Sequence, residues 1–325
     1  MPRALTLPSP RERGEALKRR DRRAYFLASL EDMKSLSPRL ASAYLRRRVK
    51  RGLEAATSLR DARRVFDLRL PYAEPAGGFR FERIGGVAGE WAGEGGATLL
   101  YLHGGAFFAG SPRHYRPISA AFASLGFSVF TPAYRLAPRH PFPAALDDAL
   151  AVCAALAERG GIVIAGDSAG GGLALSLMIS RRDAGLPLPA AAALFSPWTD
   201  LAVTGASARE NEGSDPLFSR RMLKNAARAY LNAESPRNPL ASPLYGNLRG
   251  LPPLLLHAST SELLRDDSAR LAARAVEAGV DARVALWADA PHCWQLAAAL
   301  MPQALQSIEQ AAAFLREQAG EGALD

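Results

Sequence analysis

Residues 161–172 read GIVIAGDSAGGG, and a helical pattern, LALSLMIS (residues 173–180), follows at once. The stretch predicts a buried strand, a sharp turn with Ser168 at its apex, and a helix that begins directly after the turn. Glycines two residues before and two residues after a strained serine allow such a strand and helix to pack closely, as in a nucleophile elbow. The motif alone is weak, because a serine between glycines also occurs in ordinary loops. The strand before it and the helix after it favour a nucleophile at a helix N-terminus, where negative charge is stabilised.

Apolar strands and helical patterns alternate around this stretch. The predicted strands after residue 96 are ATLLYLH, FSVFTPAY, IVIAGDS, AAALFSP, PLLLHAS and RVALWAD. Helical patterns are expected at residues 118–125, 143–158, 173–182, 268–278 and 294–316. Near-continuous apolar strands between helices indicate an α/β fold with a largely parallel sheet that is covered on both faces. Ligand chemistry is then expected at the carboxyl ends of the strands.

The earlier part of the chain is expected to differ. Residues 64–71 and 78–85 alternate in polarity as edge strands do. Residues 21–60 predict two or three short helices, with apolar positions at Phe26, Leu30, Leu40, Tyr44 and Leu53.

A second Gly-rich segment, HGGAFFAGS (residues 103–111), follows the strand ATLLYL directly. Backbone N–H groups that stabilise an oxyanion must approach it closely, and a Gly-rich turn permits this. We expect the N–H groups of Gly105 and Ala106 to act together with that of Ala169, the residue after the serine. His103 is a tempting catalytic base, but its position at a strand end before a Gly turn favours a structural histidine that bonds the loop.

Two histidines lie downstream of the serine. His257 lies inside an apolar strand, whereas His292 lies in a loop before the last helix and is free to reach the serine, so His292 is the predicted base. Its acidic partner is sought after the strand PLLLHAS. Asp266 and Asp267 resemble N-terminal capping residues of the next helix, and Glu262 lies nearer the strand end. Glu262 is therefore preferred, and Asp266 remains the alternative.

The composition sets limits on the class of protein. The 325 residues suffice for one large α/β domain with a lid, and no apolar run reaches membrane-spanning length. Residues 1–70 have a net charge of +11 and the rest of the chain −3, so the basic character belongs to an N-terminal arm. Basic runs there are typical of solvated helix faces, and no nucleic-acid partner is expected.

Arg22-Arg23 resembles an export signal, but charged residues soon interrupt the following segment, so export is rejected. The two cysteines indicate neither a disulfide scaffold nor a zinc site, and we expect a cytoplasmic protein.

Taken together, HGGAF, YRLAPRHPFPAALDDA (residues 134–149), GDSAGG, SPWTDL, DPL and the His292 loop resemble the hormone-sensitive-lipase-like (family IV) esterases of the α/β-hydrolase superfamily. The resemblance runs from about residue 61 to the C-terminus. It implies an eight-stranded sheet and a cap made from the N-terminal helices and an insertion. The expected organisation is an arm with cap helices (1–60), the first part of the core (61–202), the cap insertion (203–240) and the second part of the core (241–325).

The resemblance also assigns the site residues. It places the nucleophile on Ser168, the base on His292, the acid on Glu262, and the oxyanion hole on the turn Gly104 to Ala106 with Ala169. Three departures stand out: Ala106 replaces the third glycine of the turn, Glu262 with Leu263 stands where the family usually has Asp-Pro, and Arg139 replaces a usual glutamate.

These expectations converge on a serine carboxylesterase that forms an acyl-enzyme on Ser168, with an activity that rises from mildly acidic to alkaline pH. Cys293, beside the predicted base, is interpreted as a packing residue. Neither a metal nor a cofactor is needed, the partner is a small ester of short to medium acyl chain, and a homodimer remains open. Amide, carbamate or deacetylase chemistry uses the same groups, and a non-catalytic small-molecule receptor is the remaining alternative. The aromatic and apolar side chains that line a pocket, or alternatively belong to the core, are Phe107, Phe108, Trp198, Leu217 and Phe218.

Overall fold

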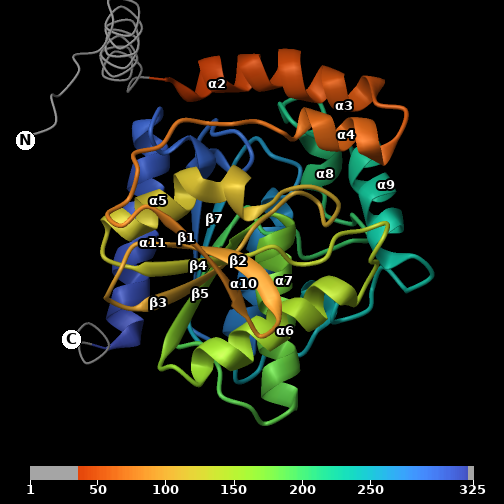
Figure 1. The fold of residues 1–325 in the computed structure, drawn as a ribbon. Coiled ribbons are helices and arrows are strands. Elements are labelled where there is room, and N and C mark those ends of the chain that lie inside the picture. Colours follow the sequence, from red (N-terminus) through yellow and green to blue (C-terminus); the bar gives the residue numbers. More distant parts are fainter. Residues whose placement is uncertain (1–35, 321–325) are drawn as a thin grey trace, which may run out of the picture.

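The protein is organised around one eight-stranded sheet, which a computed structural model describes for residues 36–320 (Figure 1). The strand order is β1-β2-β4-β3-β5-β6-β7-β8. β1 and β2 pair antiparallel, as do β2 and β4, and every other pairing is parallel. The strands are β1 Phe79–Ile84, β2 Val87–Ala92, β3 Thr98–Leu102, β4 Ser128–Pro132, β5 Ile162–Asp167, β6 Ala192–Phe195, β7 Leu254–Ser259 and β8 Ala282–Trp287. The expected α/β class with a mostly parallel eight-stranded sheet is confirmed.

Helices cover both faces of the sheet (Figure 1). Along β3, Leu99 and Tyr101 join one buried apolar cluster, and Leu100 and Leu102 join the other, as the two-residue period of a strand requires. The first cluster packs against α5 and α11, and the second against α6, α7 and α10. Burial on both faces explains why the central strands are almost continuously apolar. The helices are α5 Arg116–Ser124, α6 Ala144–Ala157, α7 Ala169–Asp183, α10 Arg265–Glu277 and α11 Pro302–Ala319.

A helical layer lies over the carboxyl ends of the parallel strands and comes from two distant parts of the chain (Figure 1). Its first part is α2 Pro38–Leu45, the π-helix η1 Arg46–Lys50, α3 Arg51–Ala55 and α4 Leu59–Val65; its second part is α8 Ser207–Glu210 and α9 Arg220–Leu231. Arg46 donates to the carbonyl oxygens of Gly213 (2.8 Å) and Ser214 (2.9 Å). Lys50, which is buried, donates to the carbonyl oxygen of Asp215 (2.8 Å). These bonds join the two parts into one layer, which we call the cap; the exact segment boundaries stay a prediction.

Several predicted elements differ from the structure. Residues 64–71 form no strand, because α4 runs to Val65 after its N-cap Ser58, whose side chain accepts the N–H of Asp61. The predicted helix 294–316 is two helices, the 3-10 helix η4 Trp294–Ala297 and α11, and Pro302 begins the second. Two further 3-10 helices, η2 Pro112–Tyr115 and η3 Pro243–Tyr245, also begin at prolines.

The structure tests only part of what was predicted for the N-terminal arm, because it describes the chain from residue 36 onward. Leu40 and Tyr44 are exposed, so these apolar positions are not core positions. Phe26, Leu30 and the twin-arginine segment lie outside the described residues. Among the residues described, no helix combines the length and the apolar character that crossing a membrane requires.

Candidate active site

Ser168 occupies a strained turn between β5 and α7. Its φ of 50° and ψ of −121° lie in a region that non-glycine residues rarely adopt. A Cβ atom on Gly166 would lie 2.6 Å from the carbonyl oxygen of Gly170, and one on Gly170 would overlap the carbonyl oxygen of Leu102. Only glycines fit at both positions, which is the reason for the G-x-S-x-G pattern. The predicted strand, turn and helix are therefore present.

The Gly-rich turn after β3 lies beside this serine. The N–H groups of Gly105 and Ala106 donate to no residue within 36–320, and neither does the N–H of Ala169 at the start of α7. Gly104 differs, because its N–H donates to Oδ1 of Asp167 at 2.8 Å. Gly104 therefore shapes the turn, and its N–H is not available to an oxyanion. Ala106 adopts a φ of 53°, a left-handed conformation that is more strained for alanine than for glycine.

Asp167 is a functional residue that the sequence analysis did not single out. It is buried, and it accepts hydrogen bonds from the hydroxyls of Tyr101 (2.9 Å) and Tyr115 (3.1 Å) as well as from Gly104. Burial raises the pKa of this carboxyl, although the hydrogen bonds from Tyr101 and Gly104 act in the opposite direction. Asp167 directly precedes Ser168, so its hydrogen bond with Gly104 holds the Gly-rich turn beside the serine. Its position inside the G-D-S-A-G motif, next to Ser168, is the feature of the sequence that could have indicated it.

His292 and Glu262 form a buried pair. Nδ1 of His292 lies 2.5 Å from Oε2 of Glu262, and Oε1 of Glu262 accepts the N–H of Ser259 at 2.7 Å. The carboxylate is thereby fixed from both sides. The other predicted acid, Asp266, accepts the N–H of Ser207 and pairs with Arg265 instead. Of the two candidate acids, Glu262 is the one that contacts the histidine.

The loop that carries His292 is anchored beside the serine. The carbonyl oxygen of Phe195, the last residue of β6, accepts the N–H of Ser168 at 2.8 Å and contacts the thiol of Cys293 at 4.0 Å. Nε2 of His292 is buried and has no hydrogen-bond partner among the described residues. This nitrogen is therefore available for a proton from the serine, and catalytic contacts of this kind often tighten only when substrate binds.

Opposing influences act on the pKa of His292. Burial lowers it, whereas the hydrogen bond and the negative charge of Glu262 raise it, as do the carboxylates of Asp215 and Asp167. The raising influences are larger in sum, so the pKa lies above the usual 6.5. The imidazolium form of His292 is thus stabilised by the acids around it.

Asp215 joins the cap to this pair, a connection that the sequence did not indicate. Its carboxylate accepts the N–H groups of Leu217 (2.7 Å), Phe218 (2.9 Å) and Leu263 (2.8 Å). Leu263 follows Glu262 in the chain, and the ring of Phe218 packs edge-on against His292 with centroids 5.1 Å apart. Burial raises the pKa of the Asp215 carboxyl, which the three N–H donors and His292 oppose.

The remaining candidate groups are structural in their contacts. Nδ1 of His103 lies 2.7 Å from the carbonyl oxygen of Gly104, and burial lowers the pKa of His103 to about 4. Nδ1 of His257 lies 2.7 Å from the Ser307 hydroxyl, and burial lowers the pKa of His257 to about 4 as well. Burial raises the pKa of the Cys293 thiol well above its usual value. His103 bonds the loop as predicted, and Cys293 is a packed thiol.

A cavity of about 340 Å³ lies between the cap and the Gly-rich turn. Ala106 and Phe108 border it from the turn, and Phe218 borders it from the side of His292. The rest of its wall comes from α3, α4, α9, the segment 56–58 between α3 and α4, and Phe66 after α4. Among the predicted pocket residues, Phe108 and Phe218 line this cavity. Phe107 and Trp198 are buried in the core, where the Phe107 ring stacks on Tyr230 with centroids 3.7 Å apart. Leu217 is partly buried and does not line the cavity either.

Comparison with known proteins gives consistent similarities. The sequence family described as "alpha/beta hydrolase fold" matches residues 99–296. The chain is 42% identical over 247 residues to an acetyl-hydrolase of Streptomyces hygroscopicus, covering 74% of this chain and 83% of that protein. It is 36% identical over 241 residues to an esterase of Acinetobacter venetianus, covering 71% and 80%. The crystal structure of an esterase from the bacterial hormone-sensitive lipase family superposes with a TM-score of 0.80 at 38% identity, over 88% of this chain and 100% of that one. The matched range, residues 99–296, contains Ser168, Glu262 and His292.

Proposed function

Because the chain belongs to the α/β-hydrolase family and is a carboxylic ester hydrolase of the hormone-sensitive-lipase-like (family IV) esterases, we propose that it cleaves short- to medium-chain acyl esters through an acyl-enzyme on Ser168. The observation that carries the proposal is the convergence of three features at one sheet edge. These are the strained serine, the buried His292–Glu262 pair at 2.5 Å, and a turn with unengaged N–H groups.

In the first half of the reaction His292 removes the proton of the Ser168 hydroxyl, and the oxygen attacks the ester carbonyl. The negative charge moves to the carbonyl oxygen, where the N–H groups of Gly105, Ala106 and Ala169 stabilise it. The C–O bond to the alcohol then breaks, and His292 returns its proton to the leaving alkoxide. Glu262 stabilises the imidazolium that exists between these steps.

In the second half, water takes the place of the alcohol. His292 accepts a proton from the water molecule, the hydroxide adds to the acyl carbonyl, and the same N–H groups stabilise the oxyanion. The bond to Ser168 breaks, and the serine oxygen regains its proton from His292. The products are a carboxylic acid and the free enzyme.

The size and position of the cap cavity support the acyl preference. A volume of about 340 Å³ lies at the lower end of the range for small-molecule sites, about 300–1,000 Å³. Most of its lining is apolar, as an alkyl chain requires, and includes Leu53, Phe108 and Leu223. Short and medium chains fit this space better than the chains of long-chain triglycerides.

Amide and acetyl-group hydrolysis is the second candidate. The relative from Streptomyces hygroscopicus is an acetyl-hydrolase, and the same serine, histidine and N–H groups suffice for amide cleavage. The distinction between ester and amide therefore belongs in the same experiment as the chain-length preference.

Nitrophenyl esters from acetate to palmitate, with a nitroanilide of the preferred acyl group, test the proposal. We expect kcat/KM to peak at a short or medium chain. Ser168→Ala should lower kcat on the order of 10⁴-fold or more, because no other hydroxyl takes its place. Intact-mass analysis of a quenched reaction should detect the acyl group on the native protein and not on the variant.

Each part of the proposal has its own opposing result. Substantial turnover by folded Ser168→Ala would exclude the acyl-enzyme on this residue. A palmitate ester cleaved faster than a butyrate ester would overturn the chain-length preference, and a nitroanilide cleaved faster than the matching ester would favour the amidase.

A further inference from the structure

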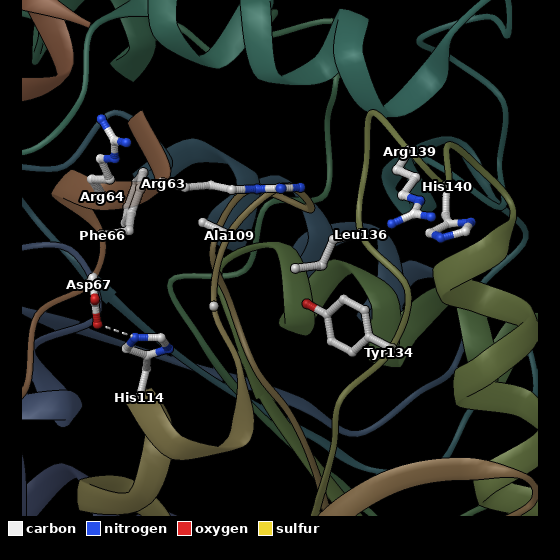
Figure 2. A pocket seen from close by; sticks show the side chains of 11 residues that line it. Arg63, Arg64, Phe66, Asp67, Ala109, His114, Tyr134, Leu136, Arg139 and His140 are labelled. Carbon is white, nitrogen blue, oxygen red and sulfur yellow. Dashed lines mark hydrogen bonds and ion pairs between the residues drawn. The ribbon is translucent and has the colours of Figure 1, made fainter. Parts of the chain in front are cut away.

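A second and larger cavity, of about 550 Å³, lies on the other side of the Gly-rich turn (Figure 2). It shares Phe66 with the cap cavity, and neither of the two cavities has Ser168 or His292 in its wall. The mechanism above makes no use of it. We call it the arginine pocket, and its wall consists of Arg63, Arg64, Phe66, Asp67, Ala109, Gly110, His114, Tyr134, Leu136, Arg139 and His140.

The wall of the arginine pocket carries an excess of positive charge. Three arginines face one aspartate, and that aspartate is already engaged, since Oδ1 of Asp67 lies 2.7 Å from Nε2 of His114. This hydrogen bond lowers the pKa of the Asp67 carboxyl. Figure 2 shows this pair on one side of the space, with Arg139 and His140 on the opposite side. The guanidinium charges are thus not neutralised by the acid in the wall.

Arg139 is the cation best placed to receive an anion. It is exposed, and within residues 36–320 it forms neither an ion pair nor a hydrogen bond. The guanidinium group presents several N–H donors in a planar fork that matches a carboxylate. His140, next to Arg139, has no side-chain partner in the described part of the chain and adds a further polar group to the same side of the pocket.

Arg63 connects the pocket with the Gly-rich turn. Its Nε donates to the carbonyl oxygen of Phe108, and its second terminal nitrogen donates to the carbonyl oxygen of Ala137 at 2.6 Å. The guanidinium group of Arg63 is held in place by these two acceptors. Of the other two arginines in the wall, Arg64 pairs with Asp61 at 3.4 Å and Arg139 is unengaged within residues 36–320. A ligand bound here would lie against the turn that carries Gly105 and Ala106.

The remaining wall is apolar. Phe66, Ala109, Leu136 and the Tyr134 ring line the pocket between the charged groups. A fully polar anion such as inorganic phosphate would leave these surfaces without a partner, whereas an aromatic or short alkyl body would cover them.

We propose that the arginine pocket is a binding site for a small carboxylate with an apolar body, whose carboxylate pairs with Arg139. Benzoate is a suitable probe, with benzyl alcohol as its uncharged analogue and inorganic phosphate as an anion without an apolar body. Calorimetric titration at low ionic strength should show that benzoate binds at least tenfold more tightly than either. The affinity should fall as salt is added, because salt screens the ion pair.

Charge substitutions locate the site. Arg139→Glu should weaken benzoate binding at least tenfold, and Arg139→Gln should weaken it less. The matched control is Arg249→Glu, which makes the same charge change at an exposed arginine outside both cavities and should change the affinity less than twofold. Equal melting temperatures of the three variants would show that folding is not the cause.

The titration must also separate this pocket from the esterase site, since a carboxylate is a product of ester hydrolysis. Protein blocked at Ser168 by a covalent organophosphate should bind benzoate as tightly as free protein. Loss of binding on blocking would place the carboxylate in the esterase site and overturn the proposal, as would unchanged binding in Arg139→Glu or tighter binding of phosphate. Failure of the organophosphate to label Ser168 would count against the acyl-enzyme and not against the arginine pocket, whose variants are assayed without it.

Discussion

His292 is the proposed base, and we expect its surroundings to set the pH dependence of catalysis. It must be neutral to accept the serine proton, and its pKa lies above 6.5 despite burial, chiefly because of Glu262. The neutral fraction therefore increases only as the pH rises through this elevated pKa. We expect the rising limb of kcat/KM for a nitrophenyl butyrate to have its midpoint above pH 6.5. The rate with Ser168→Ala, measured at each pH, supplies the background, and a midpoint below 6.5 would contradict the assignment.

Substitution of Glu262 separates its two effects on His292. In Glu262→Gln the negative charge disappears, so the influence that raises the pKa weakens while burial, which lowers it, remains. The midpoint of the rising limb should move to lower pH, and kcat should fall on the order of 10³–10⁴-fold because the imidazolium loses its stabilising carboxylate.

Asp266→Asn is the control for this experiment. Asp266 bonds Ser207 and Arg265 and does not touch His292, so the midpoint should stay where it is in the native protein. If Asp266→Asn rather than Glu262→Gln moved the midpoint, the assignment of the acid would be wrong.

Several residues of the candidate site could be proposed from the sequence alone, and others could not. Ser168, His292 and Glu262 could be proposed as site residues because each lies in a turn or loop after a recognisable strand. Asp215 and Asp167 could not be singled out in this way. Asp215 accepts three backbone N–H groups, and Asp167 accepts one backbone N–H and two tyrosine hydroxyls, and such hydrogen bonds leave no periodic pattern in the sequence. The sequence also could not show which aromatic residues line the cavity and which belong to the core. Phe107, in the core, and Phe108, beside the cavity, are neighbours in the chain.

The turn between β5 and α7 requires glycine at positions where a side chain would clash with the backbone. A Cβ atom on Gly170 would overlap the backbone at Leu102, whereas one on Gly161, before β5, would meet no atom within 4 Å. Gly170→Ala should therefore lower the free energy of unfolding by at least about 2 kcal/mol through overpacking. Gly161→Ala should leave it unchanged or raise it by up to about 1 kcal/mol. Urea denaturation measures both, and equal stabilities of the two variants would mean that β3 and α7 separate at little cost.

The central strands and the two edge strands, β1 and β8, were predicted, whereas β2 was missed and the strand expected at residues 64–71 is absent. The central strands have long apolar runs, but β2 reads VAGEWA, and its Gly89 leaves room for Phe130 on the neighbouring strand. The supposed strand at residues 64–71 alternates in polarity, yet its first two residues end a helix whose start is fixed by the cap at Ser58. Local hydrogen bonds decided that boundary more strongly than the alternation did.

At the scale of the whole molecule, the proposed acyl cavity lies where the cap meets the core. Ala226 of α9 lines the cavity and is buried, so Ala226→Phe should fill part of the space. The ratio of kcat/KM for hexanoate to that for acetate should fall by about tenfold or more, since one or two displaced methylenes are each worth about 1–3 kcal/mol. Arg221→Phe, at an exposed position on the same helix, should leave the ratio unchanged. An unchanged ratio in Ala226→Phe would place the acyl chain elsewhere.

The hydrogen bond between Arg46 and the carbonyl oxygen of Gly213 joins residues that are 167 positions apart, so the two parts of the cap are synthesised at different times. A ribosome that adds about 5–20 residues per second needs roughly 8–33 s to translate that interval. Val49 and Leu53, which belong to the buried apolar cluster of the finished protein, emerge at the start of the interval and their cap partners at its end. During translation the nascent chain therefore displays this apolar surface to chaperones and to other nascent chains. Met222 and Ala226, which line the proposed acyl cavity, are added only when synthesis is about two-thirds complete.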